Sequence, residues 1–149
     1  MEKLIINKPL YNANFPDKEV IQWDVLKIKR EQELILKFHS TNSIYRQGLR
    51  LAIDVGEGHI EINSIDYGKG VQLWYDTCPS ELHLKCVSSE GLLSVYNLFD
   101  RGAERGGVRS QLASCGMIID SIDGKRIYRC NDSGFVSNFD KLIFSIELI

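Results

Sequence analysis

Residues 81–86 read ELHLKC, so an apolar side chain follows each polar one. The same alternation appears at residues 33–39, 49–54 and 59–63. Because successive side chains of a β-strand point to opposite faces, each stretch predicts a strand with one apolar and one wet face. Such strands are typical of an antiparallel sheet that is packed on one side and solvated on the other.

Turn-forming residues separate the alternating runs and predict hairpins. The clearest signal is Asp123 followed by Gly124, between residues 117–122 and 126–131. Further turn clusters lie at residues 56–58, 67–70 and 131–134, the last before a final apolar run at 142–149. About eight to ten short strands at this spacing predict a sandwich or a barrel. We therefore expect one all-β, mainly antiparallel domain over residues 1–149, a β-sandwich, with a barrel as the alternative.

The segment at residues 20–29 has a mixed pattern. Trp23 and Val25 share one parity, whereas Leu26 has the other. A strand with a bulge near Val25 and Leu26 would let both sets face the core. A helix is the alternative, but the β-branched and aromatic residues favour a strand.

At most one or two short helices are expected in the whole chain. The polar residues 12–19 and the segment 100–114 are the only two places that invite one. Residues 100–114 contain three glycines, which favours a loop with at most one helical turn.

Composition and charge are those of an ordinary globular protein. The chain has 44% hydrophobic residues and a net charge of −2, which gives no overall field that would attract a nucleic-acid backbone. The apolar run at residues 4–6 is shorter than the roughly 7–15 residues of a secretory signal. No apolar run approaches the roughly 20 residues of a membrane span. We expect a cytoplasmic protein that has no membrane partner.

The cysteines are predicted to be free thiols in a reducing compartment. Their spacing is too wide for the close pairs that bind structural zinc. Cys86 continues the alternation of Leu82 and Leu84 and is predicted to be a buried small hydrophobe. The four cysteines are Cys78, Cys86, Cys115 and Cys130.

No catalytic motif is present. Ser110 and Ser114 flank a nucleophile-like stretch that lacks the Gly-x-Ser-x-Gly elbow. The three histidines, which could act as bases, occupy the polar parity of predicted strands; they are His39, His59 and His83. We therefore predict that the protein is not an enzyme.

Metal and phosphate sites are also not predicted. His59 and Glu61 share a strand face, but the surrounding sequence has neither a His-Glu-x-x-His motif nor the spacing of a calcium loop. The glycine-rich residues 102–107 lack the lysine and hydroxyl of a P-loop. No metal and no cofactor are expected.

An acidic segment spans residues 51–66 and contains no lysine or arginine; its carboxylates are Asp54, Glu57, Glu61 and Asp66. If the segment is a hairpin, these side chains form a compact anionic surface. One interpretation is a solvated hairpin. The other is a partner-binding surface for a basic protein, where complementary charge speeds encounter and fixes register.

Three arginines lie in a glycine-bearing loop, at Arg101, Arg105 and Arg109. Such a loop can bind phosphate, and Tyr96 and Phe99 just before it could stack on bases. The alternative is that the arginines form salt bridges within the fold.

Four stretches in the second half of the chain are similar to a known class of proteins. These are residues 93–100 (LSVYNLFD), 116–119 (GMII), 128–132 (YRCND) and 138–144 (NFDKLIF). Together they resemble small bacterial immunity proteins of toxin–immunity loci, of the contact-dependent growth inhibition type. The resemblance extends over roughly residues 70–149 and assigns no residue a role.

The resemblance implies a non-catalytic inhibitor that binds and neutralises a cognate toxin protein. If that toxin is a nuclease with a basic cleft, the acidic segment could occupy the cleft as a phosphate mimic. Two alternatives stay open: a nucleic-acid-binding β-barrel that uses Arg101 to Arg109, and an enzyme or ligand-binding protein whose site is assembled from distant residues. Nucleic acids and small molecules are the less favoured partners.

Overall fold

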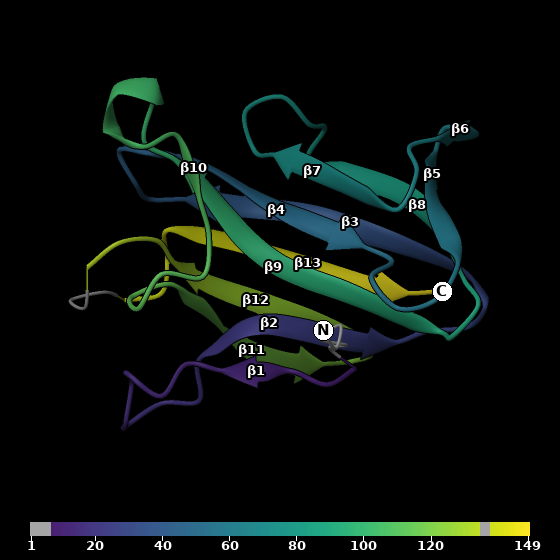
Figure 1. The fold of residues 1–149 in the computed structure, drawn as a ribbon, viewed down its shortest axis with the longest axis horizontal. Coiled ribbons are helices and arrows are strands. Elements are labelled where there is room, and N and C mark those ends of the chain that lie inside the picture. Colours follow the sequence, from purple (N-terminus) through teal and green to yellow (C-terminus); the bar gives the residue numbers. More distant parts are fainter. Residues whose placement is uncertain (1–6, 135–137) are drawn as a thin grey trace, which may run out of the picture.

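A single curled antiparallel sheet forms the fold, in a computed structural model that describes residues 7–134 and 138–149 (Figure 1). The predicted all-β class is confirmed. The strands are β1 (Leu10–Tyr11), β2 (Ile21–Lys27), β3 (Glu31–Thr41), β4 (Arg46–Ala52), β5 (Gly58–Ile62), β6 (Ile65–Asp66), β7 (Gly70–Trp74), β8 (Glu81–Ser88), β9 (Leu92–Asp100), β10 (Val108–Arg109), β11 (Gly116–Ile122), β12 (Lys125–Asn131) and β13 (Leu142–Leu148). The one helix within the described ranges is a 3-10 turn, η1 (Ala103–Arg105), as expected for the glycine-bearing loop.

The strand order is β6-β5-β8-β3-β13-β12-β11-β2-β9-β4-β7, with β1 beside β2 and β10 beside β9. Strand β2 joins two halves of the sheet, since it pairs with β11 at Ile21 and with β9 from Asp24 to Lys27. The sheet folds over at β2, so its two halves enclose one hydrophobic core. The fold thus has two layers, as predicted for a sandwich, made from one continuous sheet, as in a partly open barrel.

The core consists of the residues that the alternating pattern predicts to be inside. Leu34 and Leu84 of the larger half and Leu51 of the smaller half are all buried, and so is Cys86. Burying one side chain of this size contributes about 1.5–3 kcal/mol, so the repeated apolar parity provides most of the drive for folding. The alternation of apolar and polar residues along the strands, rather than any single contact, therefore determines this fold.

The hairpin predicted at Asp123 and Gly124 is confirmed, because β11 and β12 pair over their full length. Both turn residues have positive φ, as the favoured two-residue hairpin turns require. The hairpins expected around residues 56–58 and 67–70 are wrong. In both places the chain crosses between the two halves of the sheet, and the flanking strands pair with other strands. Turn residues reveal a change of direction but not the strand that is paired afterwards.

Strand β2 is confirmed as a strand, but its irregularity lies at Gln22. Against β1, Tyr11 lies opposite Ile21 and Leu10 lies opposite Trp23, so Gln22 is the extra residue. From Asp24 onward the register against β9 is regular, which places the bulge before the predicted position at Val25 and Leu26. The shift turns the side chain of Asp24 into the core, where it is fully buried. Residues 12–19 form a polar loop with turns and no helix, and residues 4–6 lie outside the described ranges.

Candidate functional site

The four acidic residues predicted as a partner-binding surface separate into two pairs. Glu61 and Asp66 lie opposite each other on β5 and β6. Asp54 and Glu57 lie in the connection between β4 and β5. There, Asp54 is 3.7 Å from Arg50, and Glu57 is 3.9 Å from Lys69; both distances join a carboxylate oxygen to a side-chain nitrogen. The second pair is therefore partly neutralised by cations that flank the acidic segment.

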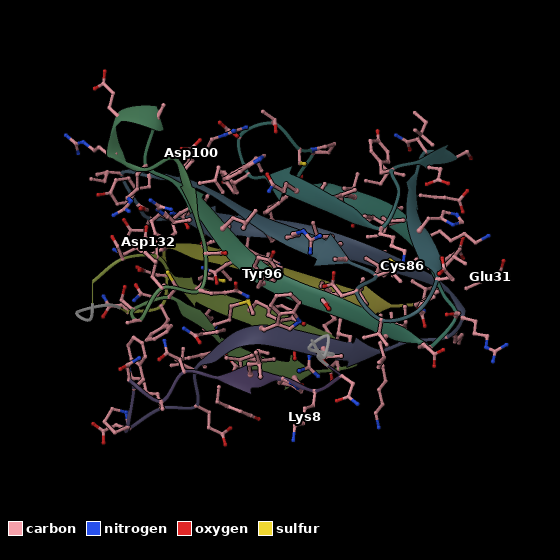
Figure 2. All side chains as sticks on the ribbon, viewed as in Figure 1. Lys8, Glu31, Cys86, Tyr96, Asp100 and Asp132 are labelled. Atoms are coloured by element: carbon pink, nitrogen blue, oxygen red, sulfur yellow. The ribbon has the colours of Figure 1, made fainter. Side chains whose placement is uncertain are left out.

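Glu61 and Asp66 belong to a row of charged side chains across four strands. The pairing registers place Glu33 of β3 opposite Lys85 of β8, Lys85 opposite Glu61, and Glu61 opposite Asp66. Directly opposed residues share one face of a sheet and interact with each other. Lys85, the single cation of the row, is 3.8 Å from Glu31, which lies at the β5 end of the molecule (Figures 1 and 2). The row thus keeps a negative balance that the sequence order does not reveal.

A hollow of about 380 Å³ lies on this face, lined mainly by Glu33, Asn63, His83, Lys85 and Ile149 together with Glu61. The carboxylate of Glu61 is 3.4 Å from Nε2 of His59, the residue two positions earlier on the same strand face. Carboxylates around a hollow are suited to receive the ammonium or guanidinium group of a partner's side chain. We call the set of Glu33, Glu61, Asp66 and Lys85 the acidic face.

Exposed apolar side chains lie on the same hairpin as two residues of the acidic face. Ile65 and Tyr67 flank Asp66 in sequence and are 56% and 50% exposed. Because side chains alternate along a strand, both point to the side of the β5–β6 hairpin opposite Asp66. The hairpin therefore presents carboxylates on one side and apolar groups on the other. Aromatic anchors next to polar groups are typical of protein–protein interfaces.

The arginine loop does not form the salt bridges that one interpretation of the sequence predicts. Within the described residues, none of its three arginines forms an ion pair. Arg101 instead lies over the ring of Phe99, with 5.9 Å between the guanidinium carbon and the ring centroid. Phe99 is fully buried, so the base-stacking role predicted for it is wrong. Arg105 ends η1 and Arg109 lies on β10.

Tyr96, the second predicted stacking residue, lies on the outer face of β9 near the middle of the molecule (Figure 2). Its ring is 4.9 Å from that of Trp23 and 5.9 Å from the guanidinium carbon of Arg50. These contacts come from β2 and β4, so Tyr96 is packed away from the arginine loop. The structure thus places Arg101 and Arg109 beside Phe99, whose ring is buried, and places Tyr96 elsewhere.

A buried polar network is the feature that the sequence reasoning missed. Asp24 accepts a hydrogen bond of 2.6 Å from the Tyr128 hydroxyl, and its carboxylate lies 3.3 Å from Nη2 of Arg126. Burial, together with the charge of Asp24, raises the pKa of Tyr128 well above its usual value, so the hydroxyl remains a proton donor. An aspartate among the apolar residues of β2 was the available signal, but the bulge at Gln22 hid which face its side chain takes.

The cysteines are free thiols, as predicted, and three of the four are buried. Burial raises the pKa of Cys86 to about 12 and that of Cys115 to about 11. Thiols with such values are poor nucleophiles at neutral pH. Among the described residues, no group of three or more histidine, cysteine or carboxylate side chains could hold a metal ion.

Comparison with known proteins adds no relative to this geometry. In the part of the chain that the structure describes, no helix is long and apolar enough to cross a membrane. The chain matches no family model, no curated protein and no solved structure.

Proposed function

We propose that this protein is a non-catalytic protein-binding module, an immunity protein that neutralises a cognate bacterial toxin in the cytoplasm. The observation that carries the proposal is the acidic face, where carboxylates from three strands lie in one row and two of them, Glu33 and Glu61, line a hollow. The resemblance of the second half to immunity proteins supplies the class of partner. A rigid sheet with such a face needs no further chemistry to act as an inhibitor.

The charge of the face favours a basic partner. Glu33, Glu61 and Asp66 lie in one row with a single lysine, and that lysine is shared with Glu31. Attraction between this face and a basic partner speeds their encounter. It weakens as salt is added, because the Debye length is only about 8 Å at physiological ionic strength. A toxin that attacks nucleic acid carries a basic cleft, and the row presents carboxylates to it in place of phosphates.

The test uses a toxin domain, which the proposal expects to be encoded beside the gene of this protein. Cells that produce the toxin should survive when they also produce this chain, and the two purified proteins should form a complex. Reversing the charge of the row in an E61K/D66K double variant should lower the association rate roughly tenfold at low salt. The matched control is E57K, which reverses an exposed carboxylate that lies outside the hollow and beside Lys69.

Each outcome bears on a separate part of the proposal. Absence of both protection and binding would overturn the immunity function. Binding that is equally fast with the wild type and the double variant would remove the acidic face from the interface. A larger effect of E57K than of E61K/D66K would move the interface to the connection between β4 and β5.

A further inference from the structure

A second pocket lies where β2 and β11 separate. The two strands pair only at Ile21 and Met117; β2 then joins β9, whereas β11 continues into its hairpin with β12. The pocket between them has a volume of about 440 Å³. It lies on other strands than the acidic face, and its lining includes Leu26, Lys27, Lys125, Arg126, Ile146 and Leu148.

The walls of this pocket are apolar and its rim is cationic. Leu26 and Ile146 are buried core residues, whereas Leu148 is 37% exposed at the entrance. Lys125 lies 3.7 Å from Glu147, while Lys27 forms no ion pair with a described residue. An apolar wall below positive groups is suited to a ligand with a hydrocarbon part and an anionic head.

Arg126 is held in a fixed orientation at the edge of this pocket. Its Nη2 atom is 3.3 Å from Asp24, which is fully buried and also bound to the Tyr128 hydroxyl. Only Nη2 of the guanidinium forms a hydrogen bond, and its Nε, which is buried, finds no partner among the described residues. The side chain as a whole remains about one-third exposed.

A structural role alone explains this arrangement poorly. A buried ion pair is often no more stabilising than apolar side chains of the same size, because both charges lose their hydration. An arginine that is fixed by a buried aspartate, and still has unused donors beside an apolar pocket, is instead typical of an anion-binding residue. Its planar donors match the two oxygens of a carboxylate.

We propose that this pocket binds a small amphiphilic carboxylate, with the carboxylate on Arg126 and the hydrocarbon tail on Leu26, Ile146 and Leu148. Asp24 acts as a positioning residue that orients the guanidinium. The pocket lining contains three cations, of which Lys125 and Arg126 pair with Glu147 and Asp24, and Lys27 has no ion pair with a described residue. This inference does not depend on the proposed function, because it concerns different strands and a different class of ligand.

The test is calorimetric titration with octanoate, alongside 1-octanol and octylamine as probes with the same tail and a different head. Octanoate should bind at millimolar concentration, and the neutral and cationic probes should bind at least tenfold more weakly. A D24N/R126Q double variant removes both members of the ion pair, so no buried charge is left alone, and should weaken octanoate binding at least tenfold. An L148W variant, which fills the entrance, should do the same without changing any charge.

The control is E61K, which changes the acidic face and should leave octanoate binding unaltered. The proposal is overturned if octanoate does not bind, if 1-octanol binds equally well, or if both pocket variants bind octanoate like the wild type. Should D24N/R126Q fail to fold, the L148W variant and the comparison of head groups decide the matter. Binding of a toxin partner plays no part in this readout, so the two proposals stand or fall separately.

Discussion

Replacing Tyr128 with phenylalanine isolates one hydrogen bond of the buried network. The ring of Tyr128 stacks on that of Phe144 with 4.6 Å between centroids and 7° between planes, and phenylalanine keeps this contact. The substitution removes only the hydroxyl that donates to Asp24. Asp24 then keeps Arg126 as its partner while remaining fully buried.

The expected loss follows from the charge of the acceptor. A hydrogen bond to an ionised group contributes about 1.5–3 kcal/mol, compared with about 1 kcal/mol for a neutral pair. We therefore expect Y128F to lower the free energy of unfolding by about 2 kcal/mol. For a chain of this length such a loss corresponds to a fall in Tm of about 4–8 °C.

Urea unfolding followed by tryptophan fluorescence measures this loss. Tyr11, which is exposed, provides the control: Y11F should change the free energy of unfolding by less than about 0.5 kcal/mol. A loss in Y128F that is no larger than in Y11F would refute the view that this hydroxyl stabilises a buried carboxylate. A double-mutant cycle with D24N then assigns the energy to the pair, since two groups in contact are coupled.

The same variant changes the response to alkaline pH. The pKa of Tyr128 in the folded state lies well above its usual value because of burial and the nearby charge of Asp24. Above about pH 10 the unfolded chain loses this proton while the folded chain keeps it, so stability falls as pH rises. Wild type should therefore lose up to about 1.4 kcal/mol per pH unit more than Y128F in this range. Equal slopes would show that Tyr128 titrates as a free phenol.

Two further predictions concern the thiols and one glycine. A thiol reagent should label one cysteine in the folded protein, the half-buried Cys78, and all four after unfolding, and C78S should abolish the native reaction. Rapid labelling of a second thiol would contradict the burial of the other three. Gly58→Ala should cost about 1–3 kcal/mol more than Gly68→Ala, since both have positive φ but only at Gly58 would a β-carbon overlap the Val87 carbonyl. Equal losses would mean that β5 is free to shift on β8.

The alternation of apolar and polar residues was sufficient to predict the all-β class, because successive side chains of a strand point alternately to the core and to solvent. Leu34, Leu84 and Cys86 lie inside for the same reason that Glu33 and Lys85 lie outside. The Asp123 hairpin was predictable as well, since its two turn residues determine both backbone geometry and partner strand. Strand faces and two-residue hairpin turns, which depend on neighbouring residues in the chain, could therefore be predicted from the sequence.

Pairing between strands distant in sequence was not predictable. This is why the hairpins expected at residues 56–58 and 67–70, and the position expected for the bulge in β2, are wrong. Nothing near residues 56–58 indicates that β4 will pair with β7 and β9, whereas β5 will pair with β8. The burial of the Asp24 side chain depends on one extra residue, Gln22, which can be recognised only from the register of β2 against β1. A bulge inverts the parity of the strand residues that follow it, so an error in its position exchanges the core and surface faces of the residues between the predicted and the actual bulge.

The acidic face shows the same limit at the level of function. Residues 51–66 contain four carboxylates and no lysine or arginine. The fold nevertheless brings Arg50 to Asp54 and Lys69 to Glu57. It also adds Glu33 from β3 to the row that contains Glu61. Charge density depends on which side chains lie close together in the fold and not on their order in the chain. The order therefore overstates the negative charge at Asp54 and Glu57, and it omits Glu33 from the row of Glu61 and Asp66. The comparison of E57K with E61K/D66K is informative for this reason, because it sets the surface inferred from chain order against the one assembled by strand pairing.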